Sequence, residues 1–249
     1  MTLVHAIILG IVQGLTEFLP VSSSGHLLLL QKLGIGEPSI FFNIALHMGT
    51  LLAVVVYFRK DIWQIIRKPF TPYNCKLLIS TIITVVIALI FRKYFEDVLI
   101  GKYLASGFLL TAILLFVAQM RLGSKRYAGE ITYRASIFAG LMQGLAVLPG
   151  ISRSGATITT LLLGGADRKE AGKYSFLLSI PIIIGAFIME LPRGAAESVE
   201  VFPLVAGMLF AFVCGLAAIR LFIRLLSNRS LIPFCIYLVV LSIVMLFWL

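Results

Sequence analysis

Long apolar stretches alternate with short polar ones along the chain. Six stretches are nearly free of charged residues, and they cover residues 41–58, 77–91, 103–120, 174–191, 201–219 and 231–249. A helix needs roughly 17 to 25 mostly apolar residues to cross the hydrocarbon core of a bilayer. Only helices and closed barrels satisfy their backbone hydrogen bonds in lipid, and continuous apolar runs lack the alternation of a barrel strand. The pattern predicts an all-α integral membrane protein with six transmembrane helices.

Two further apolar segments are interrupted near their middle. Residues 3–33 contain Pro20 followed by the polar cluster SSSGH, and residues 134–165 contain Pro149 followed by the cluster SRSG. Proline breaks the helical hydrogen-bond ladder, while serine and glycine favour turns and helix caps. Each segment is therefore predicted to be a re-entrant helix–loop–helix that enters and leaves on the same face of the membrane.

The two interrupted segments are copies of one another. At a constant offset of 130 residues, eight of the nineteen positions in 7–25 are identical in 137–155. The chain then forms a single membrane domain built from a first repeat of about 1–125 and a second of about 130–249. Three spanning helices follow each copy. Because three is an odd number, the second half must be inverted relative to the first, which is a recurring architecture with its binding site where the broken helices meet.

Composition and charge agree with this picture. Hydrophobic residues make up 60% of the chain and charged residues 13%, whereas a soluble domain carries about 25% charged residues. The net charge of +10 follows from topology. If the stretch 41–58 ends in the cytoplasm, fifteen of the basic residues lie inside and five outside, and Arg153 belongs to neither loop set. This positive-inside bias sets the orientation of the protein in the membrane. It also explains the net positive charge without a nucleic-acid partner. The five outside are Lys32, Arg92, Lys93, Lys102 and Arg193.

The serine-rich interruptions are candidate anion sites. Each supplies the N-terminus of a half-helix, whose free N–H groups and positive dipole end attract negative charge, and the serine hydroxyls add donors. The predicted substrate-binding residues are Ser22, Ser24, Gly25, Ser152, Arg153, Ser154 and Gly155.

Three ionisable side chains in these segments carry the candidate chemistry. Arg153 is costly inside a membrane and suits a bidentate contact to phosphate, although a structural bridge to Glu17 is an alternative. Glu17 lies on the same helix face as Gln13, and near a phosphate it would bind a divalent cation or act as a general base, with a purely structural pairing as the alternative. His26 at a helix N-terminus would be a base, a nucleophile or a packed structural residue. For His47, inside the first spanning stretch, an interhelical hydrogen bond is expected.

Two strings resemble a known family. QGLTEFLPVSSSGH at 13–26 and PGISRSG at 149–155 look like the two motifs of the integral-membrane undecaprenyl-pyrophosphate phosphatases of the bacitracin-resistance type, and the resemblance covers essentially the whole chain. It implies that Ser23 and His26 are the functional serine and histidine and that Arg153 binds phosphate. It further implies a divalent cation, Mg²⁺ or Ca²⁺, at Glu17 and Gln13.

The implied reaction removes the terminal phosphate from a C55 isoprenyl pyrophosphate. This would regenerate the lipid carrier of cell-wall synthesis and confer bacitracin resistance. The implied location is the bacterial cytoplasmic (inner) membrane, with the catalytic face open to the periplasm. The nucleophile is left open between Ser23, His26 and an activated water, and a homodimer is left open as well.

Two other classes of protein share features with this sequence. A lipid-phosphate transporter or flippase would use the same inverted-repeat architecture, and it would move lipid without releasing phosphate. A second superfamily of lipid phosphatases also contains a Ser-Gly-His motif, but it requires a histidine after a Ser-Arg pair. His47 is the last histidine in this chain, so that superfamily is excluded.

Overall fold

The structure, a computed structural model, contains helices and no strands among the residues that it describes. It describes residues 1–94, 103–122, 129–194, 200–228 and 230–248. The first half contains α1 (Leu3–Phe18), α2 (Ser23–Lys32), α3 (Ile40–Tyr57), α4 (Arg59–Arg67), α5 (Pro72–Tyr94) and α7 (Leu104–Leu122). The second half contains α8 (Tyr133–Leu145), α9 (Arg153–Leu163), α10 (Arg168–Gly194), α11 (Val201–Asn228) and α12 (Ile232–Trp248). Most of the predicted boundary between the repeats lies outside the described residues, as do Lys102, Lys125, Arg126 and Arg229.

Five of the described helices are long and apolar enough to cross a membrane, namely α3, α5, α7, α10 and α11. The sixth predicted crossing corresponds to α12, a shorter apolar helix of 17 residues. Large hydrophobic side chains such as Leu52, Ile82 and Val213 are exposed on the outer faces of these helices. Since lipid replaces water as the solvent of such surfaces, the exposure agrees with the predicted all-α membrane protein.

The first interrupted segment consists of two helices joined by a tight turn. Helix α1 ends at Phe18 because Leu19 precedes Pro20, and its ψ of 147° is extended rather than helical. Ser22 then has a φ of +66°, a left-handed conformation that non-glycine residues rarely adopt. The chain reverses at this residue, and α2 begins at Ser23.

The second interrupted segment has the same plan with different turn chemistry. Helix α8 ends at Leu145, and Gly150 adopts a φ of +90° between it and α9. A methyl group on Gly150 would lie 2.4 Å from the carbonyl oxygen of Leu104, so only glycine fits there. Ser152 caps α9, since its Oγ accepts a hydrogen bond of 3.1 Å from the backbone N–H of Gly155.

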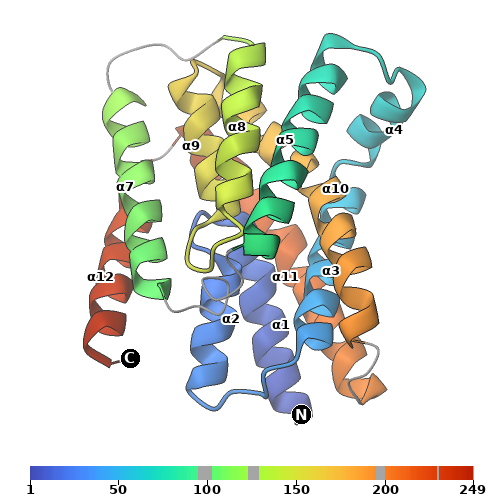
Figure 1. Ribbon diagram of the computed structural model, residues 1–249, viewed down its shortest axis with the longest axis vertical. Coiled ribbons are helices and arrows are strands. Elements are labelled where there is room, and N and C mark those ends of the chain that lie inside the picture. Colours follow the sequence, from blue (N-terminus) through green and yellow to red (C-terminus); the bar gives the residue numbers. More distant parts are fainter. Residues whose placement is uncertain (95–102, 123–128, 195–199, 229, 249) are drawn as a thin grey trace.

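The two helical hairpins approach each other from opposite ends of the bundle (Figure 1). The α1–α2 hairpin rises from the end that holds the N-terminus, and the α8–α9 hairpin descends from the other end. Their turns meet near the middle of the molecule, where Ser154 Oγ donates a hydrogen bond of 3.0 Å to the carbonyl of Leu19. The two predicted anion sites are therefore adjacent in space.

Backbone contacts fix the hairpins against the long helices. Helix α1 packs on α11 so closely that a methyl group on Gly10 would lie 2.3 Å from the carbonyl oxygen of Gly207. Helix α8 packs on α5 in the same way, and a methyl group on Gly140 would lie 2.6 Å from the carbonyl oxygen of Ser80. Small residues at such positions let helices approach closely in lipid. The helices that carry the candidate site therefore have little freedom to shift.

Candidate active site

A cavity of about 280 Å³ lies where the two hairpin turns meet. One part of its wall is polar and includes Glu17, Ser22, Ser23, Ser24, His47, Gln143, Ser152 and Arg153. The other part is apolar and comes mainly from the spanning helices α3 and α10, through Ile44, Ile182, Ile183, Ala186 and Phe187. The cavity therefore places charged and hydroxyl groups directly beside an aliphatic surface.

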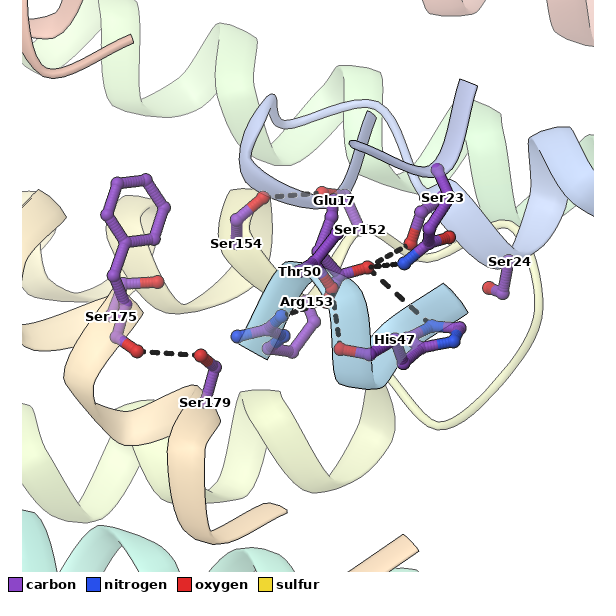
Figure 2. Close-up of polar contacts among 12 residues, drawn as sticks. Glu17, Ser23, Ser24, His47, Thr50, Ser152, Arg153, Ser154, Ser175 and Ser179 are labelled. Carbon is purple, nitrogen blue, oxygen red and sulfur yellow. Dashed lines mark hydrogen bonds and ion pairs between the residues drawn. The ribbon is translucent and has the colours of Figure 1, made fainter. Parts of the chain in front are cut away.

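Glu17 is the centre of the polar wall, and four side chains surround its carboxylate (Figure 2). Arg153 forms an ion pair with Oε1 through Nη2. Ser23 Oγ donates a hydrogen bond of 2.5 Å to Oε2, and Gln13 Nε2 donates one of 2.9 Å to the same oxygen. Nε2 of His47 lies 3.6 Å from Oε2. The carboxylate is almost completely buried, so these donors replace the water that would otherwise solvate it.

Arg153 uses only part of its hydrogen-bonding capacity in this arrangement. Its Nη1 is buried and has no hydrogen-bond partner in the described part of the chain. A buried, unpaired donor on a charged group is costly, and a guanidinium matches the geometry of two phosphate oxygens. Arg153 is also the first residue of α9, where the helix dipole adds positive potential. The orphan nitrogen is what a site for a phosphate group would show without its ligand.

The serine clusters divide into cavity-lining and supporting residues. Ser22, Ser23, Ser24 and Ser152 line the cavity, whereas Ser154 joins the two turns. The two glycines that follow the clusters have packing roles. A methyl group on Gly25 would lie 2.5 Å from the ring of Phe108, and one on Gly155 would lie 3.1 Å from Cβ of Ser152. Neither glycine is among the residues that form the cavity wall.

His26 lies apart from Glu17, contrary to the expectation that it joins the same site. Its Nδ1 is 2.8 Å from the carbonyl oxygen of Ser22, and its Nε2 is 2.6 Å from the hydroxyl of Tyr237 on α12. Its ring stacks on Tyr237 and meets the edge of Phe108. Position 26 is about one turn further along α2 than Ser23, and its ring packs between Phe108 of α7 and Tyr237 of α12. Both ring nitrogens are engaged, and His26 does not line the cavity.

His47 is the histidine that the structure brings to Glu17. It lies on α3, its Nδ1 is 2.8 Å from the carbonyl oxygen of Asn43, and its Nε2 faces the carboxylate. Sequence reasoning anticipated a polar contact to another helix but did not place His47 in the site. The available signal was its position, as a histidine in the middle of an apolar spanning stretch is expensive unless it has a partner.

Gln143 is a second cavity-lining residue that was not anticipated. It corresponds to Gln13 in the repeat, and its Nε2 donates a hydrogen bond of 3.1 Å to Thr84 Oγ1. The Thr84 hydroxyl is within hydrogen-bonding distance of two backbone carbonyls, so it must accept from the amide of Gln143. This leaves the Oε1 of Gln143 without a partner among the described residues.

The donor set allows only a limited role for a metal ion. Among the residues described, no group of three or more histidine, cysteine or acidic side chains is arranged to hold a metal. Glu17 is the carboxylate in the cavity wall, whereas Gln13 is not part of that wall, donates its N–H to Glu17 and has no partner for its Oε1 among the described residues. Magnesium is commonly held by one or two carboxylates together with substrate phosphates and water. The site therefore fits a cation that arrives with a phosphorylated substrate, and not a cage made by the protein alone.

Comparisons with known proteins agree on one family. The family model for "Bacitracin resistance protein BacA" matches residues 6–244. An undecaprenyl-diphosphatase of Carboxydothermus hydrogenoformans is 38% identical, over 97% of this chain and 95% of the relative. Undecaprenyl-diphosphatase 4 of Bacillus thuringiensis is 41% identical, over 95% and 93%, and an undecaprenyl-diphosphatase of Korarchaeum cryptofilum is 38% identical, over 99% of both chains. The chain belongs to the BacA family of bacitracin resistance proteins.

Proposed function

We propose that the protein hydrolyses undecaprenyl pyrophosphate to undecaprenyl phosphate and inorganic phosphate, and so recycles a lipid carrier and confers bacitracin resistance. The observation that carries this proposal is the buried guanidinium of Arg153, which has an orphan nitrogen and shares a cavity with Glu17 and Ser23. The curated relatives are named for this activity. The comparisons give no support to the transporter alternative.

The walls of the cavity suit the two parts of such a substrate. The pyrophosphate would bind Arg153, the serine hydroxyls and the N-terminal ends of α2 and α9. The isoprenyl chain would lie against the aliphatic side chains of α3 and α10 and remain in the bilayer. Glu17 is the residue that would hold a divalent cation, which we assign as Mg²⁺ or Ca²⁺, and the cation would neutralise part of the pyrophosphate charge.

The geometry favours Ser23 as the nucleophile. Its hydroxyl donates directly to Glu17, the arrangement in which a base activates a nucleophile. In the proposed step, the hydroxyl proton passes to Glu17 and the serine oxygen forms a bond with the terminal phosphorus. The bond from that phosphorus to the bridging oxygen breaks, and the lipid monophosphate leaves. Water then attacks the phosphorus of the phosphoserine, and the bond from that phosphorus to the serine oxygen breaks. The proton held by Glu17 returns to the serine oxygen, and inorganic phosphate leaves with the oxygen and protons of the water. A water molecule bound in place of the serine oxygen would achieve the same hydrolysis in one step.

His26 has a positioning role in this scheme. It contacts the carbonyl of Ser22, the residue with the left-handed backbone conformation that immediately precedes Ser23. Because Tyr237 and Phe108 hold the imidazole in place, the histidine fixes the peptide that presents Ser23 to Glu17. Local strain of this kind persists only where the surroundings enforce it.

We further propose that the membrane arrangement has six crossings and two re-entrant hairpins in an inverted repeat. The two hairpins enter from opposite ends of the bundle, which supports this arrangement. The close packing of α1 on α11 is also repeated in the packing of α8 on α5, as expected for two copies of one unit. Under the positive-inside rule, the α1–α2 hairpin then opens to the periplasmic side of the cytoplasmic membrane.

Phosphate release from a long-chain isoprenyl pyrophosphate by the purified protein in detergent tests this function. We expect wild-type protein to release phosphate, a metal chelator to suppress release, and Ser23→Ala to lower the rate by about 10³-fold or more. Ser242→Ala is the matched control, because Ser242 Oγ is a buried donor to the carbonyl of Ala105 at a distance from the cavity. Movement of labelled lipid across vesicles without any phosphate release would contradict the proposal and favour the transporter.

Replacement of His47 separates its role from that of an ordinary polar residue in the bundle. His47→Leu is expected to lower kcat/KM by about 10-fold or more, because it removes the polar group that lies 3.6 Å from the largely buried carboxylate of Glu17. His47→Gln retains a donor and should lose less. His5→Leu is the control, as His5 accepts a hydrogen bond from Gly36 near the N-terminus and is not part of the cavity wall. Wild-type kinetics in His47→Leu would show that the contact to Glu17 has no part in turnover.

A further inference from the structure

Helix α4 is a short amphipathic helix between two spanning helices. One face carries Ile62 and Ile65, which pack against the core. The adjoining side of the helix leaves Trp63 55% and Ile66 64% exposed, and Phe70, just beyond the helix, is 90% exposed. In Figure 1, α4 lies outside the main bundle, beside the ends of α3 and α5. A basic helix that follows directly on a spanning helix and exposes tryptophan and aliphatic side chains is typical of an amphipathic helix lying in the membrane interface.

A cavity of about 650 Å³ separates α4 from the first turns of α5 and α10. Three cationic side chains line it, from Arg67, Lys68 and Lys173, together with the carboxylates of Asp61 and Glu170. Lys173 pairs with Asp61 at 2.5 Å. This cavity shares no residue with the one around Glu17.

Two cationic side chains and one hydroxyl group in this cavity could donate hydrogen bonds to a ligand. Within the described residues, neither Arg67 nor Lys68 forms an ion pair with a carboxylate. The guanidinium of Arg67 lies 4.8 Å from the ring centre of Trp63, which keeps it at the border between the cavity and the exposed apolar face. The hydroxyl of Tyr73 is buried in the cavity wall and has no hydrogen-bond partner there among the described residues. Such a group has a hydrogen-bond donor available to a bound ligand.

We propose that this cavity binds the headgroup of an anionic phospholipid. The phosphate would contact Arg67 and Lys68 and accept a hydrogen bond from Tyr73, because a guanidinium and an ammonium together match a phosphodiester. The acyl chains would run past Trp63 and Ile66 into the bilayer. The adjoining apolar face favours a lipid over free phosphate, because free phosphate has no apolar part that could contact the exposed tryptophan and isoleucine.

Trp63 is a built-in reporter for this proposal. The chain contains two tryptophans, so Trp248→Phe leaves Trp63 as the only one. The full-length variant is reconstituted in two vesicle preparations of equal lipid composition. In one preparation the phosphatidylglycerol is brominated, and in the other the phosphatidylcholine is brominated. Bromine quenches tryptophan at short range. We expect the labelled anionic lipid to quench Trp63 several-fold more strongly than its mole fraction predicts. Quenching in proportion to mole fraction from both lipids would overturn the proposal.

Two double variants of equal charge separate a specific site from general attraction. Arg67→Gln with Lys68→Gln should remove the preference for the anionic lipid, while quenching by the neutral lipid persists because the apolar face is unchanged. Arg59→Gln with Lys60→Gln removes two positive charges from the same helix but outside the cavity, and it should keep the preference. Equal losses in both variants would show only a diffuse surface attraction and would contradict a headgroup site. Unchanged phosphate release in both confirms that each variant is folded.

Discussion

Arg153→Ala is expected to lower kcat/KM for phosphate release by about 10³-fold or more, because removing a single charged or preorganised donor at a phosphoryl group commonly has this effect. The guanidinium pairs with Glu17, and its Nη1, which has no hydrogen-bond partner among the described residues, remains available to the substrate. When the substrate phosphate binds, it competes with Glu17 for the guanidinium of Arg153. The carboxylate of Glu17 is then free to accept a proton. Loss of Arg153 therefore removes both the phosphate anchor and this exchange. Steady-state kinetics in detergent measure the change.

Two companion variants show whether charge or shape is responsible. Arg153→Lys keeps the positive charge but not the planar fork, and we expect it to recover only part of the lost activity. Arg224→Ala removes an exposed arginine of α11 outside the cavity wall and should behave as wild type. If Arg153→Ala kept more than a tenth of wild-type activity, Arg153 would be a structural partner of Glu17 and not a phosphate ligand.

Glu17→Gln is expected to be as inactive as Arg153→Ala and also less stable than wild type. Glutamine cannot take the proton of Ser23, so hydrolysis loses its base. The same change leaves the largely buried guanidinium of Arg153 without its counter-charge, which costs about 3 kcal/mol or more in comparable buried pairs. Thermal unfolding in detergent should show a lowered midpoint for this variant.

The double variant Glu17→Gln/Arg153→Met separates stability from activity. Removing both charges relieves the unpaired cation, so we expect much of the lost stability to return. Hydrolysis should stay absent, because the base and the phosphate anchor are both missing. A double variant whose destabilisation equals the sum of the two single variants would mean that Glu17 and Arg153 are not coupled in the folded protein.

Local sequence signals were sufficient to locate the two hairpins. The end of α1 follows from Leu19 preceding a proline, and the start of α9 follows from the cap at Ser152, so both depend on neighbouring residues alone. The internal repeat supplied the long-range information, because two copies of one turn imply two equivalent positions that face each other. A bridge between Glu17 and Arg153 was only the alternative interpretation of Arg153 in the sequence, and the structure shows the two side chains as an ion pair.

The identity of the histidine beside Glu17 was out of reach of such reasoning. His26 belongs to the motif, but successive helical residues differ by about 100° in direction, and the left-handed turn at Ser22 sets where that rotation begins. His47 lies 30 residues from Glu17 in the sequence, and its approach depends on how α3 packs against α1. The cavity beneath α4 likewise depends on three elements that no local pattern brings together.

The divided wall of the cavity around Glu17 has a consequence for the direction of the proposed reaction. Inorganic phosphate is fully hydrophilic and can leave only into water, on the polar side. The lipid monophosphate keeps its chain among the aliphatic side chains of α3 and α10 and departs sideways into the bilayer. The two products thus enter different phases. Inorganic phosphate is diluted in the aqueous solution, and the lipid monophosphate diffuses in the plane of the bilayer. Resynthesis would require both to return to one small cavity at the same moment, so we expect their separation to make each turnover effectively irreversible.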